Sequence, residues 1–351
     1  MLVLCDEPEK LLTNGQKNSL AVLHLKLETK IMDIKKLLKI ILLLPVLLTS
    51  LAAFRVSEIQ QLKVGKAPTY TAVSPDGRYL FVSNYASDNI SIIDTTTNRI
   101  KNHFYGGYEP LGIAVTPIGD KIFIANPSNG LIKVINSETY EVLDDIKVGE
   151  APRNISMSPN GFLAFVANYG KGKIGRVDFI DTATHRIIGE VEVGVRPMET
   201  IVSELGDQLF VICGGSNDLH IIDIQKREVI KRLQVGQIPD ALALSPDGRV
   251  LYVSNSRSND VSVIDLLDME EIRRVPVGSK PFSIAVHKNG SIFVVETGDN
   301  QLSIFSPSFE KITSMKVGKS PIDVTFSLDY RHAYVTAERD NRVFVYTVEG
   351  Q

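Results

Sequence analysis

The chain has 351 residues, 38 of them basic and 41 acidic, and beyond residue 53 the balance is 31 to 36. A mildly acidic body of this kind lacks the clustered basic face by which proteins bind nucleic acid, so we expect no nucleic-acid partner. Only two cysteines are present, Cys5 and Cys213, which excludes a fold held together by several disulfides.

The N-terminal part has the pattern of an exported protein. Residues 1–31 are charged and aperiodic and precede a second methionine, Met32, which indicates a mis-called start or a disordered leader. Residues 32–53 contain three lysines, an apolar run over 40–48 and small residues at 50–52, as in a signal peptide. The apolar span is shorter than the ~20 residues of a membrane-crossing helix. We therefore expect a periplasmic or extracellular protein. The alternative is an outward-facing protein held in the membrane by an uncleaved segment.

The region 54–351 is built on an internal repeat. Seven times a glycine precedes a proline by three residues, and successive glycines are 40 to 45 residues apart. A period in this range with strand signals throughout predicts a β-propeller with one blade per repeat. The anchor glycines are Gly65, Gly107, Gly149, Gly194, Gly236, Gly278 and Gly318.

Each repeat predicts a four-stranded antiparallel blade. In the first repeat a strand over 71–73 ends in a Ser-Pro-Asp-Gly turn, and strands over 81–84, 90–94 and 99–104 follow. The last repeat lacks its outer strand, whereas an additional strand over 56–64 precedes the first anchor. We predict an all-β, seven-bladed propeller in which this N-terminal strand completes the last blade and closes the ring.

The second strands carry a recurring motif, which reads FVSN at Phe81–Asn84, FIAN at Phe123–Asn126, FVAN at Phe165–Asn168 and YVSN at Tyr252–Asn255. The third strands end in VIDT or a close variant. Over residues 56–348 the chain thereby resembles the YVTN family of seven-bladed propellers, with YncE-like proteins among its members. It departs from the motif in blades four and six, where Cys213 and Thr297 are assigned to the asparagine position. The absence of tryptophan excludes a WD40 propeller.

The resemblance implies an exported binding scaffold more readily than an enzyme. The family is related to the haem d1 domain of cytochrome cd1, and amine dehydrogenase subunits and seven-bladed lactonases look similar. The main hypothesis is a monomeric scaffold that binds an unidentified protein or a small polar ligand, without catalysis. The alternatives are a periplasmic redox accessory and a lactonase-like hydrolase.

The candidate site follows from propeller geometry. Residues just after the anchor prolines should point toward one channel mouth, and among them Arg153, Glu199 and Asp240 lie on successive blades. They could orient a small polar ligand or a charged loop of a partner. The alternative is a solvated rim of mutually paired side chains. The predicted site residues are Tyr70, Arg153, Asn154, Glu199, Asp240, Phe282 and Asp323.

Other reactive residue types predict structural roles. The acidic residues that end the third strands, such as Asp94 and Asp181, recur once per blade and are expected to cap turns. Cys213 is expected to be an inert buried thiol. The histidines fall at unrelated repeat positions, and neither CxxCH nor zinc-ligand spacings occur. We therefore predict no catalytic residues, no bound cofactor and no metal site.

Overall fold

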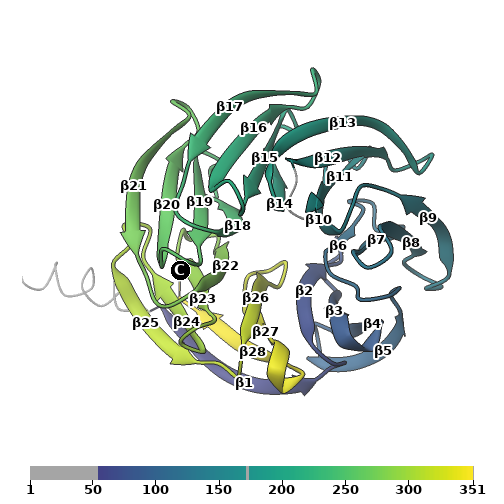
Figure 1. Cartoon of the computed structure of the whole chain (residues 1–351). Coiled ribbons are helices and arrows are strands. Elements are labelled where there is room, and N and C mark those ends of the chain that lie inside the picture. The colour runs from purple at the N-terminus through teal and green to yellow at the C-terminus, as the bar shows by residue number, and fades with distance from the viewer. Residues whose placement is uncertain (1–53, 171–173, 351) are drawn as a thin grey trace, which may run out of the picture. The chain divides into compact units, whose positions relative to one another are not determined.

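The computed structural model describes residues 54–170 and 174–350. The predicted leader (1–31) and signal segment (32–53) lie outside this range. Within it, no helix has the length and apolar character needed to cross a membrane. Residues 55–349 form one compact unit of seven four-stranded antiparallel sheets, arranged as the blades of a ring (Figure 1).

The first four blades each have strands in chain order from the central channel outward. Blade one contains β2 (Pro68–Val73), β3 (Tyr79–Asn84), β4 (Asn89–Asp94) and β5 (Arg99–Tyr105). Blade two contains β6 (Ile113–Val115), β7 (Lys121–Asn126), β8 (Leu131–Asn136) and β9 (Val142–Lys147). Blade three contains β10 (Pro152–Met157), β11 (Leu163–Asn168), β12 (Ile174–Asp181) and β13 (Arg186–Val195). Blade four contains β14 (Pro197–Val202), β15 (Gln208–Cys213), β16 (Asp218–Asp223) and β17 (Glu228–Gln234).

Blades five and six repeat this order, and blade seven takes its outer strand from the N-terminal side. Blade five contains β18 (Pro239–Leu244), β19 (Val250–Asn255), β20 (Asp260–Asp265) and β21 (Glu270–Pro276). Blade six contains β22 (Pro281–Val286), β23 (Ile292–Glu296), β24 (Gln301–Phe305) and β25 (Lys311–Lys316). Blade seven contains β26 (Pro321–Phe326), β27 (His332–Ala337), β28 (Arg342–Glu349) and β1 (Arg55–Lys63). Two single-turn 3-10 segments, η2 (Tyr85–Ser87) and η4 (Glu338–Asp340), follow β3 and β27.

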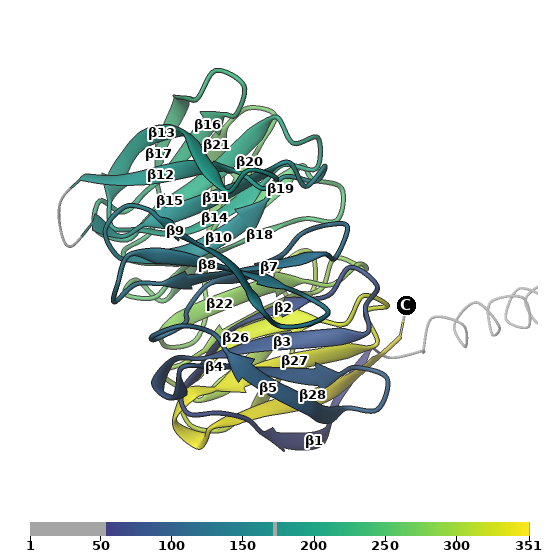
Figure 2. The same ribbon diagram turned by 90° about the vertical axis from the view of Figure 1, so that its right-hand side faces the viewer.

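The ring closes as the sequence predicts. β1 pairs antiparallel with β28 over eight residue pairs, from Arg55 with Glu349 to Lys63 with Arg342. In Figure 2 the first and last strands of the propeller lie side by side at the outer edge of blade seven. Leu62 packs into the core of this closure with Val343 and Val345. The closure thus covers the edge of β28 with a strand from the other end of the propeller.

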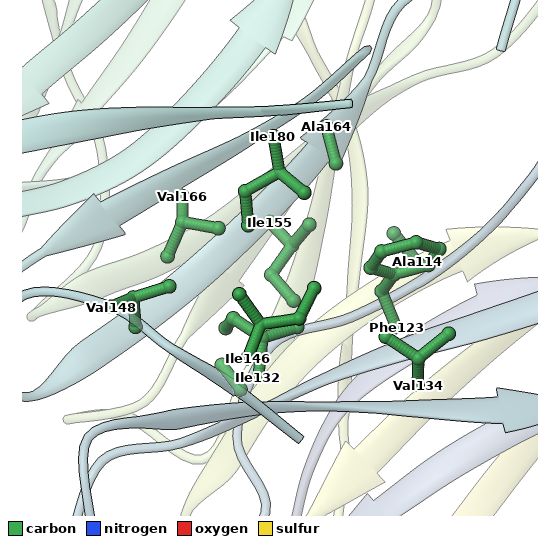
Figure 3. Close-up of a cluster of buried hydrophobic side chains, with 11 residues drawn as sticks. Ala114, Phe123, Ile132, Val134, Ile146, Val148, Ile155, Ala164, Val166 and Ile180 are labelled. Atoms are coloured by element: carbon green, nitrogen blue, oxygen red, sulfur yellow. The ribbon is translucent and has the colours of Figure 1, made fainter. Parts of the chain in front are cut away.

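The core lies between the faces of neighbouring blades. The middle strands are buried almost along their whole length because both faces of each blade are covered, whereas the outer strand β5 is mostly exposed. Between blades two and three, Phe123 and Ile132 pack with Ile155, Val166 and Ile180 from the facing blade (Figure 3). Apolar residues from consecutive repeats therefore join into continuous packing.

The anchor segments carry a latch between neighbouring blades. The residue before each anchor proline has a positive φ of 49–58°, although none of the seven is glycine. In five blades its backbone N–H donates to an Asn or Asp side chain, 2.8–2.9 Å away, in the hairpin between the second and third strands of the preceding blade. The acceptor–donor pairs of this inter-blade latch are Asp88–Glu109, Asn217–Ile238, Asn259–Lys280, Asn300–Ser320 and Asn341–Ala67.

The asparagine that ends the second strand has a structural role. The Nδ2 atom of Asn84 donates to Asn89 Oδ1 (2.9 Å) and Ser91 Oγ (2.8 Å), and Asn255 makes the equivalent pair of contacts in blade five. In blade six the assignment of Thr297 to this position is wrong. Glu296 occupies it, because Glu296 pairs with Pro281 as Asn255 pairs with Pro239.

The acidic residues at the ends of the third strands cap turns, as predicted. Asp94 Oδ1 accepts hydrogen bonds from the backbone N–H groups of Thr96 and Thr97, and Asp181 makes the same contacts in blade three. Both side chains are held by their own turn and lie on different blades. They do not converge on one site.

Candidate functional site

The inner strands of the seven blades stand around the axis of the ring (Figure 1). Between them lies a cavity of about 250 Å³. Its walls come from β2, β10, β14, β18, β22 and β26, with one residue of β6. Both polar and apolar side chains line it. The lining residues are Tyr70, Thr71, Ile113, Asn154, Ile155, Glu199, Thr200, Ile201, Leu242, Ser283, Ile284, Asp323, Val324 and Thr325.

A β-bulge at the start of the inner strands sets the direction of these side chains. Pro152 pairs with Asn168, but Asn154 pairs with Ala167, so that one residue of β10 has no counterpart on β11. The same kind of register shift occurs at the start of β2, β14, β18, β22 and β26. A bulge bends the strand and re-aims its side chains. In five blades the second residue after the proline consequently lines the cavity.

The second residue after the proline connects one blade to the next. Asn154 Oδ1 accepts from the backbone N–H of Thr200, at 3.1 Å, and Glu199 Oε2 accepts from that of Leu242, at 3.0 Å. These donors lie on inner strands, which are sheet edges whose backbone groups have no strand partner on the channel side. The acceptor side chains therefore satisfy the inner edge of the following blade.

Asp323 makes the same connection across the closure of the ring. Its Oδ2 atom accepts from the backbone N–H and the hydroxyl of Thr71, at 3.0 and 2.6 Å. Its Oδ1 atom accepts from the hydroxyl of Ser283, at 3.0 Å. One carboxylate thus bridges blades six, seven and one. Both of its oxygens are occupied by neighbouring groups of the protein.

Arg153 and Tyr70 differ from these residues because they hold polar atoms without partners. The Nε atom of Arg153 and the hydroxyl of Tyr70 are buried and make no hydrogen bond within the described structure. The Arg153 guanidinium lies 6.0 Å from the ring centre of Phe282, within range of a cation–π interaction. Asp240 is 4% exposed and interacts electrostatically with Arg153. Unpartnered donors in a channel are places where a ligand can bind.

Burial shifts the acid–base properties of the site. It raises the pKa of Glu199 to about 8 and that of Tyr70 to about 12. It also raises the pKa of Asp240 to about 6, against the opposing effects of a hydrogen bond from Ser256 and the charge of Arg153. At neutral pH Glu199 therefore holds its proton, whereas Asp240 is ionised and faces the charged Arg153.

Of the seven predicted site residues, Tyr70, Asn154, Glu199 and Asp323 line the cavity. Arg153, Asp240 and Phe282 are not among the lining residues, although Arg153 interacts electrostatically with Tyr70. Asn154, Glu199 and Asp323 make the inter-blade contacts expected of a paired rim, and Arg153 and Tyr70 retain unpartnered donors. Their part in binding stays a prediction. The sequence reasoning missed Thr71, Thr200 and Ser283, whose hydroxyls contact the acceptor side chains. Their regular position, two or three residues after a proline, was the available signal.

Comparison with known proteins supports the fold and gives one family similarity. Residues 205–339, less than half of the chain, match the model of the SMP-30/gluconolactonase/LRE-like region. That segment runs from blade four to blade seven and includes Asp240 and Asp323, but not Arg153. A hydrazine synthase from Kuenenia stuttgartiensis has a similar structure, with a TM-score of 0.74 and 22% identity over 82% of this chain and 98% of that one. None of the curated proteins matches the chain.

Proposed function

We propose that the chain is a binding protein whose channel takes a small, neutral, oxygen-rich ligand, such as a sugar or a sugar lactone. The observation that carries this proposal is a pair of unpartnered donors: the Tyr70 hydroxyl, on a residue of the cavity wall, and Nε of Arg153, which interacts electrostatically with Tyr70. A buried donor without an acceptor costs about 1–3 kcal/mol, which a ligand oxygen would recover. The function thus rests on these two residues more than on the acidic ones.

The charges around the cavity favour a neutral ligand over an anion. Arg153 is already balanced by the ionised Asp240, and the oxygens of Asp323 also face this region. An added anion would be repelled by these carboxylates, whereas a carbonyl or hydroxyl oxygen would accept from Arg153 and Tyr70 without that cost. The protonated Glu199 adds a further hydrogen-bonding group with little charge.

The size of the cavity supports a small ligand. At about 250 Å³ it lies below the ~300–1,000 Å³ of typical drug-sized pockets. A monosaccharide or a similar compact molecule suits this volume better than a large cofactor. The cavity-lining residues include no histidine, cysteine or methionine, so no observation there favours the redox alternative.

The proposal extends to the cellular setting and the family of the protein. The lysines and apolar run of residues 32–53 support export, and a binding protein outside the cytoplasm would meet free sugars there. The FVSN-type motifs support membership of the YVTN family. We further propose that the protein is a monomer, since β1 already covers the outer edge of β28.

A binding screen followed by substitution tests the proposal. Neutral sugars, sugar lactones and the corresponding acids would be screened by thermal shift, and titration calorimetry would give the affinity of any hit. Arg153→Met should weaken binding by at least about tenfold, because a hydrogen bond from a charged donor contributes about 1.5–3 kcal/mol. Tyr70→Phe should weaken it less. Arg249→Met, at a position 83% exposed, is the matched control. Unchanged affinity in both channel variants would refute the proposal.

Lactone hydrolysis is the second candidate function, favoured by the match of residues 205–339 to the gluconolactonase-like model. In this reaction Arg153 would polarise the lactone carbonyl, and Asp240 would accept a proton from the attacking water. The ring C–O bond breaks, the alkoxide takes a proton from Glu199, and a hydroxy acid results. Acid release from aldonolactones in a pH-stat tests this step. Loss of that release in Arg153→Met and Asp240→Asn, but not in Arg249→Met, would support hydrolysis.

A further inference from the structure

Blade four departs from the other blades at the end of its second strand. Cys213 occupies the position of Asn84 and Asn255, and Asp218 and His220 occupy the positions of Asn89 and Ser91 in blade one. In blades one and five the asparagine amide joins the other two side chains through hydrogen bonds. A thiol and an imidazole cannot reproduce that arrangement. Blades one and five thus show the usual arrangement at this position, with which the cluster of blade four can be compared.

The three side chains of blade four converge in the interior. Asp218 and His220 are two residues apart on β16, so they face the same side of the sheet, and Cys213 pairs with Asp218 from β15. Cys213 is 0% exposed, His220 1% and Asp218 8%. A potential ligand atom from each lies within 4.8 Å of those of the other two. Cys213 is a free cysteine.

His220 is the observation that points to a ligand. Its Nε2 atom lies 3.2 Å from Asp218 Oδ2, yet neither ring nitrogen makes a hydrogen bond of acceptable geometry within the described structure. A buried imidazole whose ring nitrogens make no well-aligned hydrogen bond is unfavourable, and ligand atoms of Cys213 and Asp218 lie within 4.8 Å of it. Ser216 donates to the other carboxylate oxygen, at 2.6 Å, and so fixes Asp218 with one oxygen directed toward His220.

We propose that Cys213, Asp218 and His220 bind one divalent transition-metal ion, zinc being the best fit. Sulfur, nitrogen and oxygen ligands together suit zinc, whose tetrahedral sites place ligand atoms roughly 3.3–3.6 Å apart at metal distances of about 2.0–2.3 Å. The 3.2 Å separation of Nε2 and Oδ2 already matches such an edge. The remaining separations need to close by roughly 1.5 Å at most.

The charge balance agrees with a buried site. Metal binding converts the Cys213 thiol to a thiolate and releases one proton, and the thiolate and the Asp218 carboxylate then neutralise the two charges of the ion. His220 contributes a neutral nitrogen. A neutral assembly can be buried, whereas an unpaired ion cannot. Because the cluster is enclosed, the ion would enter while blade four folds and would connect β15 with β16.

Metal content and cobalt spectroscopy test the proposal on the whole chain. Protein produced with zinc in the medium should contain one zinc ion per chain, and protein loaded with Co²⁺ should show a sulfur-to-metal charge-transfer band. Cys213→Ser should abolish the band, and His220→Asn should lower cobalt affinity by at least about tenfold. His103→Asn, at an exposed histidine of blade one, is the matched control and should bind like the unaltered chain.

The unaltered chain decides the outcome even if a variant fails to fold. Protein with neither zinc nor a cobalt–thiolate band would overturn the proposal, and so would a band that survives in Cys213→Ser. Asp218→Asn preserves size and should reduce affinity with less disturbance of the fold. The test is independent of the channel, because no residue of the cluster lines the cavity.

Discussion

Glu199 should make the stability of the propeller decrease as the pH rises. Burial raises the pKa of this carboxyl group from 4.5 to about 8, so the folded state binds the proton more tightly than the unfolded chain. Stability from this group is complete below pH 4.5 and declines as the pH rises toward 8. Glu199→Gln removes the titration but retains a carbonyl oxygen that can accept from the backbone N–H of Leu242.

The size of the effect follows from the shift in pKa. Each unit corresponds to about 1.4 kcal/mol, so the difference in unfolding free energy between Glu199→Gln and the unaltered chain should change by about 3.5 kcal/mol between pH 5 and pH 8. This value is an upper bound, because the side chain remains partly open to the channel. The variant should gain stability relative to the unaltered chain as the pH rises.

Urea unfolding at a series of pH values measures this difference. Far-ultraviolet circular dichroism is a suitable probe because the chain contains no tryptophan. The exposed Glu204, replaced by glutamine, is the matched control and should leave the pH profile unchanged. If Glu199→Gln and the unaltered chain lose stability in parallel from pH 5 to pH 8, the carboxyl group is not protonated in the folded state and the reasoning fails.

Three further perturbations test the connections between blades by urea unfolding. Deletion of residues 55–63 should lower the unfolding midpoint of the whole propeller, because it removes eight residue pairs and uncovers β28; an unchanged midpoint would contradict the closure. Asn259→Ala should cost about 1–3 kcal/mol through loss of the latch to Lys280 and through its positive φ. Asn259→Gly should lower the unfolding free energy less, because glycine adopts a positive φ without strain. Equal losses in the two variants would refute the contribution of the positive φ. Asp323→Asn should cost about 1–3 kcal/mol because an amide cannot accept on both sides, and a neutral result would contradict the bridge.

The fold was predictable because each repeat carries its own turn and strand signals. The Ser-Pro-Asp-Gly turn, for example, depends on Gly77, whose φ is 73° and whose N–H bonds to Ser74. The position of Glu296 was missed because its long carboxylate replaces the amide of asparagine while bonding to Ser303 and to the anchor at Gly278. The flanking sequence did not reveal that Glu296 is equivalent to the asparagine of the other blades.

The location of the candidate site was partly predictable from the sequence, but the contacts that its side chains make were not. The prolines pointed to four residues that line the cavity, Tyr70, Asn154, Glu199 and Asp323. They did not reveal that the partner of Glu199 is the backbone of Leu242, on the next blade. Residues 43 apart in sequence become neighbours only when two blades pack. For the same reason, sequence spacing could not show that Arg153 has an unpartnered nitrogen, or that Cys213 and His220 meet in blade four.

The pairing of β1 with β28 has a consequence for folding during synthesis. During synthesis β1 leaves the ribosome first and β28 last, so the first strand waits for its partner while six blades form between them. Throughout that interval its backbone edge is open to other chains. A chain halted before residue 342 could fold most of its blades and still display this edge. The unpaired edge of β1 thereby distinguishes an unfinished ring from a complete one, and a chaperone or protease that binds exposed strands could recognise it.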